Sequence, residues 1–265
     1  MPELPEVHTF HRYFDAAALQ QKVLQVDVSD DKIIRNMSGT DFAQRMAGRT
    51  FTSSLRRGKY LFADLDNGHS VLLHFGMTGD LKLYQEAEEA PRFERFAFVL
   101  ADGNRLGFDD ARKFARVLYL EDRDAYIEEV KLGIDALDIT EEQFLTAMGQ
   151  RKVSIKGFLL DQKSLAGMGN LYADEVCYRT QVDPASPAAA IPIRKRQEIF
   201  AKMKEVLTTA VEQSPYYKDY PDNWFWNEWR HEDHLAPDGK SKVQMGKVAG
   251  RTTYWAAPWQ RLYKK

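Results

Sequence analysis

Apolar and polar residues alternate in short runs through the first half of the chain, after one helical pattern at its start. Apolar residues at near-helical spacing predict a helix over residues 4–20, with Leu4, Val7, Phe10, Phe14 and Leu19 on one face. Short runs typical of β-strands follow, and turn sequences such as Asp66-Asn67-Gly68 separate several of them. These runs cover residues 23–28, 50–54, 60–65, 70–75, 81–84, 95–100, 105–108 and 115–120. Because no helices alternate with the strands, the pattern predicts an antiparallel β-sandwich flanked by helices.

The second half of the chain has a helical pattern. Thr140 and Gln143 have the spacing of a capping box, which predicts the start of a helical stretch. A longer amphipathic helix is predicted over about 193–213, with an apolar stripe of Ile199, Met203, Val206, Leu207, Ala210 and Val211. The last forty residues return to a glycine-punctuated hairpin pattern. We therefore predict an α+β protein with a boundary at about 128–139: an N-terminal domain over 1–131, a helical domain over 140–222 and a hairpin module over 223–265.

Composition narrows the class of protein. Hydrophobic residues make up 44% of the 265, which suffices for real cores, and no run reaches the length of a membrane span. No basic-then-apolar leader precedes the first predicted helix, so we expect a cytosolic protein. The single cysteine, Cys177, excludes an internal disulfide and a zinc site built from a cysteine cluster.

Charge is distributed unevenly along the chain. The formal net charge of −2 argues against indiscriminate binding to nucleic acid. From Arg230 to Lys265, however, eight lysines and arginines accompany three acids, so that this end carries a net charge of +5. Such a basic end is either a phosphate-binding arm or a solvated charged face, and charge alone does not distinguish the two.

The first seven residues, Met1-Pro2-Glu3-Leu4-Pro5-Glu6-Val7, combine a nucleophile with two acids. Removal of Met1, which a small second residue permits, would leave Pro2 with a free secondary amine of pKa about 7.7–8.0. Such an amine can form a Schiff base at neutral pH, and Glu3 or Glu6 can shuttle a proton beside it. The alternative is a plain helix start, since proline and acids both favour the first helical turn.

This opening string resembles the start of the formamidopyrimidine-DNA glycosylase/endonuclease VIII family. A second segment, Gly167-Met168-Gly169-Asn170, lies between two helical stretches and resembles the family's helix-two-turn-helix motif. Backbone N–H groups at a glycine-rich helix start form a natural phosphate seat, which here includes Gly169. The resemblance implies that Asn170 contacts the phosphate flanking a lesion and that Lys156 contacts a second phosphate.

Four further positions match the family's site. The resemblance implies that Lys59, at the start of a predicted strand, lies in the active site and contacts a phosphate. It also maps Met77, Arg112 and Phe114 onto the three residues that fill the hole left by an extruded nucleotide. Flipping a base out of DNA costs a few kcal/mol of unstacking, and apolar wedges with an arginine offset that cost. The ordinary alternatives are a surface lysine and a buried, gap-filling methionine.

The segment from Val248 to Gln260 resembles the second half of the family's zinc finger, and Arg251 matches the finger arginine that reaches phosphates at the lesion. Ala256 and Trp259, however, occupy the expected cysteine positions. His231 and His234 have ligand-like spacing but no second ligand pair, so a closed tetrahedral site is not expected. The resemblance thus implies a zincless finger held by packed aromatic side chains, with no metal and no organic cofactor.

Taken over nearly the whole chain, the resemblance implies a monomeric base-excision-repair enzyme that binds double-stranded DNA containing damaged bases or abasic sites. The Pro2 amine would attack C1′ of the flipped nucleotide, Glu3 would assist proton transfer, Glu6 would support them, and β,δ-elimination would cut the strand. His8 and the aromatic segment 214–230 depart from the pattern of guanine-lesion enzymes, so the lesion stays open. Two alternatives also stay open: an enzyme that is mainly an abasic-site lyase, and a non-catalytic damaged-DNA-binding protein.

Overall fold

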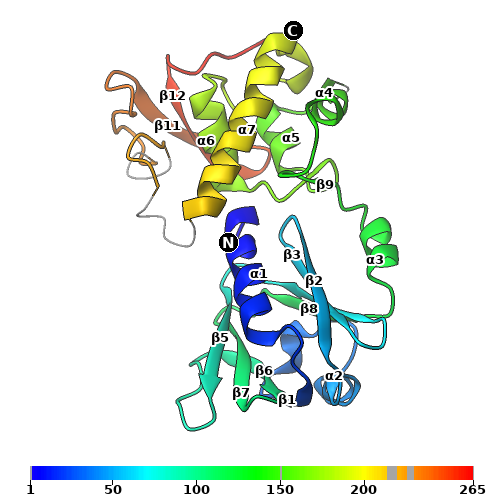
Figure 1. Cartoon of the computed structure of the whole chain (residues 1–265). Helices are drawn as coiled ribbons and strands as arrows, with labels where there is room; N and C mark the ends of the chain where they lie inside the picture. Colours follow the sequence, from blue (N-terminus) through cyan, green and yellow to red (C-terminus); the bar gives the residue numbers. More distant parts are fainter. Residues whose placement is uncertain (1, 150, 214–219, 226–229, 265) are drawn as a thin grey trace. The chain divides into compact units, whose positions relative to one another are not determined.

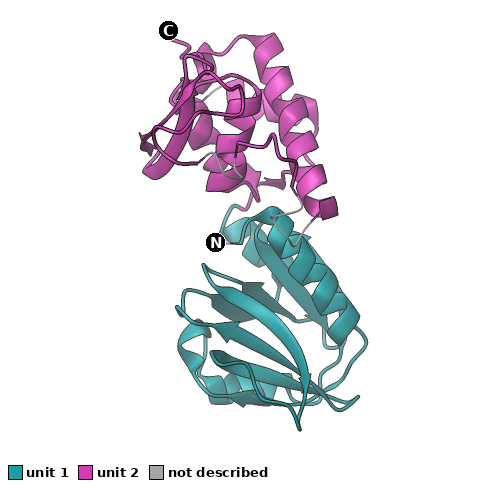
Figure 2. Cartoon of the chain, turned by 90° about the vertical axis from the view of Figure 1, so that its left-hand side faces the viewer, with its two compact units in different colours: residues 1–131 teal, residues 132–265 magenta. Residues whose placement is uncertain are grey.

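The computed structural model describes residues 2–149, 151–213, 220–225 and 230–264. The chain divides into two compact units, residues 1–131 and 132–265 (Figure 2). Much of the aromatic segment 214–230, whose role the sequence left open, lies outside the described residues. Among the helices that are described, none is both long and apolar enough to cross a membrane.

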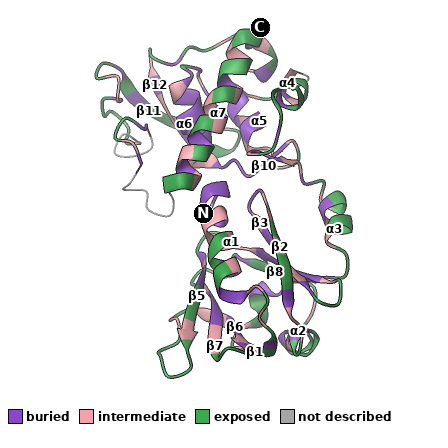
Figure 3. Ribbon diagram, in the orientation of Figure 1, coloured by how far each residue is buried: buried purple, intermediate pink, exposed green. Residues whose placement is uncertain are grey.

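The first unit is built on two four-stranded antiparallel sheets that enclose one core, as the alternating pattern predicted (Figures 1 and 3). One sheet has the order β1-β6-β7-β5, with bounds Val23–Val28, Glu94–Leu100, Asn104–Asp110 and Gly79–Gln85. The other has the order β2-β3-β4-β8, with bounds Phe51–Arg57, Tyr60–Leu65, Ser70–His74 and Arg116–Leu120. Aromatic rings join the two layers: the Phe51 and Phe98 ring centroids lie 5.3 Å apart, in an edge-to-face contact.

Helix α1 (Leu4–Ala18) lies along strand β2 and sets the direction of the N-terminus. Just beyond its C-terminal end, the Gln20 backbone N–H donates to the Phe51 carbonyl at 2.7 Å, at the start of β2. One to two turns earlier, the Ser54 hydroxyl donates to Asp15 at 2.5 Å and bonds to His11 Nε2 at 2.6 Å. The helix therefore runs antiparallel to β2, and its first turn lies toward the β2–β3 turn, as Figure 1 shows.

Two short helices of the first unit were not predicted from the sequence. Helix α2 (Gly39–Met46) begins where the Ser38 hydroxyl accepts from the Asp41 backbone N–H. Helix α3 (Arg123–Glu129) begins where the Asp122 carboxylate accepts from the Ala125 N–H, and a single 3₁₀ turn covers Asp31–Ile33. Each helix has only about two turns, which is too short for an apolar period to stand out.

The second unit contains the predicted helices. Its helices are α4 (Glu141–Gly149), α5 (Ile155–Leu160), α6 (Asn170–Arg179) and α7 (Ile193–Gln213), with a 3₁₀ turn at Ala188–Ala190. The capping box before α4 is formed: the Gln143 N–H donates to Thr140 Oγ1 at 3.2 Å, and the Thr140 N–H donates to Gln143 Oε1 at 3.0 Å. The predicted stripe of α7 is buried except for Val211, which is partly exposed.

The predicted hairpin follows the helices in the same unit. Strands β11 (Lys242–Val248) and β12 (Arg251–Ala257) pair in antiparallel register, and β12 packs against α6. A short parallel pair, β9 (Ile134–Asp135) with β10 (Leu165–Ala166), precedes α6. Val243 and Ala256 of the hairpin are buried in a small core with Tyr178, Phe225 and Ala236.

Candidate active site

The N-terminus is held by a reciprocal capping box. Glu3 is the N-cap of α1, and its side chain accepts from the Glu6 backbone N–H. Glu6 Oε2 in turn accepts from the Glu3 backbone N–H at 2.7 Å. Both carboxyl-bearing residues are buried, whereas Pro2 is partly exposed. The box fixes the backbone directly after Pro2 and holds two carboxyl groups beside it, which supports the predicted roles of all three residues.

Lys59 lies at the β2–β3 turn, the same end of the unit as the start of α1. Arg57 pairs with Tyr60, so Gly58 (φ 59°) and Lys59 form a two-residue hairpin turn. Lys59 is largely buried despite its charge. A buried lysine at a turn is not a typical surface lysine, which favours the functional interpretation of this residue.

His74, at the end of β4, joins this region but was not identified from the sequence as a site residue. Its ring contacts that of Tyr60 with centroids 5.0 Å apart, and its Nδ1 accepts from the Gly76 N–H at 3.2 Å. Burial, together with the nearby cations Arg116 and Lys59, lowers the pKa of His74 from 6.5 to about 4. The imidazole is therefore neutral at neutral pH, with Nδ1 as an acceptor.

Met77, Arg112 and Phe114 project from two adjacent loops at this end of the unit. Met77 is 40% exposed and Phe114 is 51% exposed, so neither is the buried gap-filler of the ordinary interpretation. The Arg112 guanidinium lies over the Phe114 ring, 4.9 Å from its centroid. The structure thus brings an arginine and an aromatic ring together beside an exposed methionine, which is the composition predicted for a wedge.

The buried carboxylate of Asp110 fastens these two loops to each other. Its Oδ1 accepts from the Thr78 hydroxyl at 2.5 Å and from the Arg112 N–H at 3.2 Å. Its Oδ2 accepts from the Ala115 N–H at 2.9 Å. Sequence reasoning missed this residue, because nothing in the local pattern distinguishes Asp110 from an ordinary acid in a turn.

Gly76 lets the two loops approach closely. It has φ +59°, and a Cβ built on it would lie 2.4 Å from the Phe114 backbone carbon. A side chain at this position would push the loops apart. Phe75, its neighbour, stacks near the Phe10 ring of α1 with centroids 4.3 Å apart, so the Met77 loop is also anchored to the helix that carries the N-terminus.

In the second unit, Gly169 and Asn170 form the start of α6. Gly169 is the N-cap, with no side chain to cover the first N–H groups of the helix. The preceding loop is held by Gln162, whose Oε1 accepts from the Gly167 N–H at 3.0 Å and whose Nε2 donates to the Met168 carbonyl at 2.8 Å. A ten-residue helix beginning at a bare glycine presents its N–H groups and positive dipole end to an anion.

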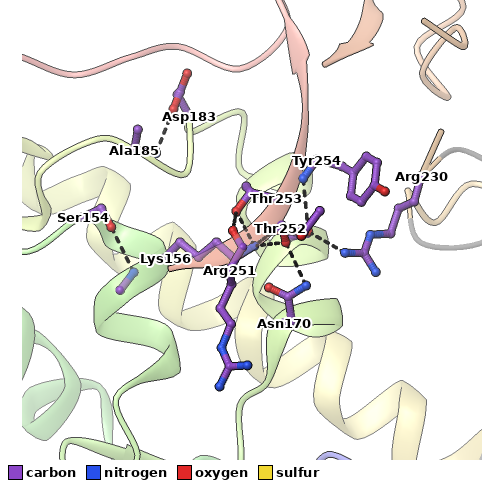
Figure 4. Close-up of polar contacts among 12 residues, drawn as sticks. Ser154, Lys156, Asn170, Asp183, Ala185, Arg230, Arg251, Thr252, Thr253 and Tyr254 are labelled. Atoms are coloured by element: carbon purple, nitrogen blue, oxygen red, sulfur yellow. Dashed lines mark hydrogen bonds and ion pairs between the residues drawn. The ribbon is translucent and has the colours of Figure 1, made fainter. Parts of the chain in front are cut away.

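Arg251 follows the hairpin turn and is exposed. Ala249 (φ 51°) and Gly250 (φ 72°) make the two-residue turn between β11 and β12. One residue on, the Thr252 carbonyl accepts from Asn170 Nδ2 at 3.0 Å (Figure 4). Asn170 and Arg251, predicted to bind phosphates from segments eighty residues apart, are thereby brought to the same edge of the unit.

Lys156 does not occupy the position that the resemblance implied. Its side chain is 0% exposed, and its ammonium donates to Asp174 at 2.6 Å, Thr253 Oγ1 at 2.8 Å and the Thr252 carbonyl at 3.3 Å. An ammonium with three protein acceptors and no solvent exposure does not present itself to a DNA phosphate. The described geometry makes the residue part of the internal framework and does not support the phosphate contact, which stays a prediction.

The hairpin offers no ligands at the two cysteine positions of a zinc finger. Ala256 is buried among apolar side chains, and the Trp259 indole N–H donates to the Tyr178 carbonyl at 3.2 Å. Gln260 closes the end of the hairpin, because its Oε1 accepts from the Ala256 N–H at 2.7 Å. His231 and His234 stack near each other, but within the described part of the chain no group of three potential metal ligands exists. The donor set does not fit a structural zinc ion.

Sequence models of two domains match the chain. The N-terminal domain of formamidopyrimidine-DNA glycosylase matches residues 1–117, and the helix-two-turn-helix domain of the same enzyme matches residues 132–218. Together these matches cover most of both units.

Similar full-length proteins carry the same description. A formamidopyrimidine-DNA glycosylase of Arabidopsis thaliana is 33% identical over all of this chain and 72% of its own length. That of Pelotomaculum thermopropionicum is 31% identical over 99% of this chain and 100% of its own. In structure, the Lactococcus lactis enzyme, solved non-covalently bound to DNA containing an AP site, superposes with a TM-score of 0.87 at 23% identity, covering 98% of this chain and 99% of that one. The chain belongs to the formamidopyrimidine-DNA glycosylase family.

Proposed function

We propose that the chain is a base-excision-repair DNA glycosylase with AP lyase activity. It removes oxidised bases from double-stranded DNA and then cuts the strand. Family membership supports this proposal, as do the names of the full-length relatives, which describe glycosylases. The proposed enzyme acts as a monomer, in the bacterial cytosol where the nucleoid lies.

The observation that carries the proposal is the N-terminal constellation of the first unit. Buried Glu3 and Glu6 cap each other around the backbone that follows Pro2, at the end of the unit that carries Lys59. Once Met1 is removed, the Pro2 amine attacks C1′ of the damaged nucleotide, and the bond from C1′ to the base breaks. Glu3 supplies the proton at the sugar that lets the ring open, and the departing base takes the electron pair of the broken bond.

The same amine explains strand cleavage. The iminium formed by Pro2 and C1′ makes the hydrogen on C2′ acidic, because the electrons released there delocalise onto nitrogen. Loss of that proton expels the 3′ phosphate, and a second elimination expels the 5′ phosphate. Hydrolysis of the remaining iminium returns the free Pro2 amine. No oxidant, metal or organic cofactor takes part in these steps.

Groups of each unit supply the contacts to DNA in this proposal. In the first unit, Met77, Arg112 and Phe114 fill the space of the extruded nucleotide, and Lys59 binds a phosphate. In the second unit, the N–H groups after Gly169, the Asn170 amide and the Arg251 guanidinium bind phosphates near the lesion. Six of the predicted side chains thus contact the DNA in this proposal, whereas the ammonium of Lys156 is held by internal acceptors.

Two duplexes test the proposal and separate it from its alternatives. One contains an oxidised base and the other a preformed abasic site. The proposed enzyme cleaves both. Cleavage of the abasic duplex alone would indicate a lyase with weak excision, and cleavage of neither would indicate a binding protein. A Glu3→Gln variant, which keeps the capping geometry but loses the acid, should lose base excision and keep much of the cleavage of abasic DNA.

A further panel addresses the lesion. Duplexes that carry an oxidised purine or an oxidised pyrimidine, each opposite all four bases, would rank the substrates by excision rate. His8 departs from the family pattern and lies, partly exposed, on α1 near the His11 ring. A substitution of His8 should be tested in the same assay.

A further inference from the structure

A buried carboxylate in the second unit joins three separate segments. Asp174 of α6 is fully buried and accepts from Lys156 of α5 at 2.6 Å. Its second oxygen accepts from Arg230 at 3.0 Å and from the Tyr254 backbone N–H of β12 at 3.4 Å. Figure 4 shows Lys156, Arg230 and Tyr254 gathered at strand β12 of the hairpin. One side chain therefore connects both helices of the phosphate-binding motif to the hairpin.

The two cations of this network also touch the hairpin directly. Lys156 donates to Thr253 Oγ1 and to the Thr252 carbonyl, while the Arg230 guanidinium lies over the Tyr254 ring, 4.8 Å from its centroid. Burial lowers the pKa of Lys156 and raises that of Asp174, whereas the neighbouring opposite charges act against both shifts. A buried ion cluster is stable only when every member has its partners, so its geometry is strongly constrained.

The network ends on the residues that flank the proposed phosphate contacts. The Thr252 carbonyl accepts from Lys156 and also from Asn170, so one peptide group links the buried cluster to the N-terminus of α6. Arg251 is the preceding residue of the same strand. The backbone position of Arg251 and the rotamer of Asn170 thus both depend on where the cluster holds β12.

We propose that Asp174, Lys156 and Arg230 are positioning residues for DNA binding. They hold the hairpin on α6 so that Arg251 and Asn170 engage neighbouring phosphates together, the task that a structural metal performs in a finger with cysteine ligands. This inference rests on the proposed function, because it assigns the network a role through two residues that bind DNA. It gives Lys156 a role that its burial allows.

Arg230 is the best member to change, because its side chain is 17% exposed whereas those of Lys156 and Asp174 are fully buried. Arg230→Met keeps the aliphatic stem and removes the charge, and Arg230→Lys restores a cation that can reach the carboxylate. Arg261→Met is the matched control: Arg261 also lies over a tyrosine ring, that of Tyr263, at 5.2 Å, in the same basic end of the chain. Circular dichroism and the melting temperature establish that each variant is folded.

The test is a double-mutant cycle with Arg251→Ala, read as the affinity for a duplex with an uncleavable abasic-site analogue at several salt concentrations. Arg251→Ala should reduce the slope of log K against log salt by about 0.9, as for one phosphate contact. Arg230→Met should weaken binding about tenfold and reduce the slope in the same direction, as expected when a charge-assisted contact is lost. Because Arg230 acts partly through Arg251, the loss of affinity caused by Arg230→Met should be clearly smaller in the Arg251→Ala background than in wild type. Arg230→Lys should recover part of the affinity. The control variant Arg261→Met should bind the duplex with nearly the affinity of the wild-type protein.

Three outcomes would overturn the inference. Wild-type affinity in Arg230→Met would show that the network does not position the contacts. Multiplicative losses in the double variant would show that Arg230 binds DNA by itself. If the wild-type chain neither prefers the abasic duplex over undamaged DNA nor cleaves it, the proposed function fails and the inference fails with it. In the first two cases cleavage by wild type leaves the proposed function standing.

Discussion

Acidification should destabilise the first unit, in good part through the imidazole of His74. The ring is packed against Tyr60 with Nδ1 accepting from the Gly76 N–H, and burial holds its pKa near 4, against 6.5 when unfolded. Below pH 6.5 the unfolded chain takes up a proton at this site that the folded chain does not. The folded state is therefore favoured above pH 6.5, and its advantage falls as the pH drops toward 4.

The size of the effect follows from the two pKa values. Each pH unit inside the window costs about 1.36 kcal/mol of unfolding free energy, since one extra proton binds the unfolded chain. Between pH 6.5 and about pH 4 the loss comes to about 3 kcal/mol, of which about 2 kcal/mol is lost by pH 5. His74→Asn removes the titrating group and keeps an acceptor near the position of Nδ1. The variant should therefore lack this part of the pH dependence.

Urea unfolding of wild type and His74→Asn at about pH 7 and about pH 5 measures the difference. All five tryptophans lie in the second unit, so tryptophan fluorescence follows that unit and circular dichroism follows both. On acidification, the unfolding free energy of wild type relative to that of the variant should fall by about 2 kcal/mol. The change should appear in the unfolding of the first unit, which circular dichroism reports and tryptophan fluorescence does not. An NMR titration in which the His74 resonance has its midpoint near 6.5 would refute the reasoning.

Further predictions concern the wedge and the hairpin. Asp110→Asn places an amide N–H opposite donors that need an acceptor, so the unfolding free energy of the first unit should fall by about 1–3 kcal/mol. The difference in affinity between abasic and undamaged duplex should also narrow. Asp102→Asn, in the β6–β7 turn, is the matched control, and equal effects of the two variants would show that Asp110 does not fasten the two loops together. Met77→Ala should narrow the same gap without changing the salt slope, and a changed slope would contradict its wedge role. Chelators should leave cleavage and melting temperature unchanged, whereas stoichiometric zinc bound through His231 and His234 would contradict the hairpin's assignment.

Much of the fold could be predicted because its signals are local. Alternation of apolar residues located the strands of both sheets, and the stripe around Met203 located α7, since each period is written within one element. Helices α2 and α3 were missed because each depends on an N-cap and on one or two buried apolar side chains rather than on a period. Tertiary packing, not propensity, accounts for such short helices.

In the candidate site, too, residues in local motifs could be predicted and residues placed by long-range packing could not. Short motifs indicated Glu3, Lys59, Met77 and Asn170, and the structure gives each a geometry compatible with its predicted role. The position of Lys156 was not predictable from its motif, because its acceptors are Asp174, on another helix, and the hairpin nearly a hundred residues away. Whether a lysine faces DNA or a buried carboxylate depends on long-range packing, which local sequence does not specify.

Asp110 and Arg230 are positioning residues that could not be identified from the sequence. Neither lies in a recognisable motif, yet one fastens the two loops of the wedge and the other completes the ion cluster under the hairpin. Each makes a hydrogen bond to a group distant in sequence: Asp110 to Thr78 and Arg230 to Asp174. Such positioning residues become visible only when the partners are brought together by the fold.

The central claim is that the amine of Pro2 is the nucleophile. Reduction of the protein–DNA intermediate with sodium borohydride on an abasic duplex, followed by peptide mapping of the adduct, tests it most directly. The account predicts one covalent adduct on the N-terminal peptide, at Pro2, which is strongly reduced in Pro2→Gly and largely retained in Glu3→Gln. An adduct on Lys59, or no adduct from a preparation that cleaves the duplex, would contradict it.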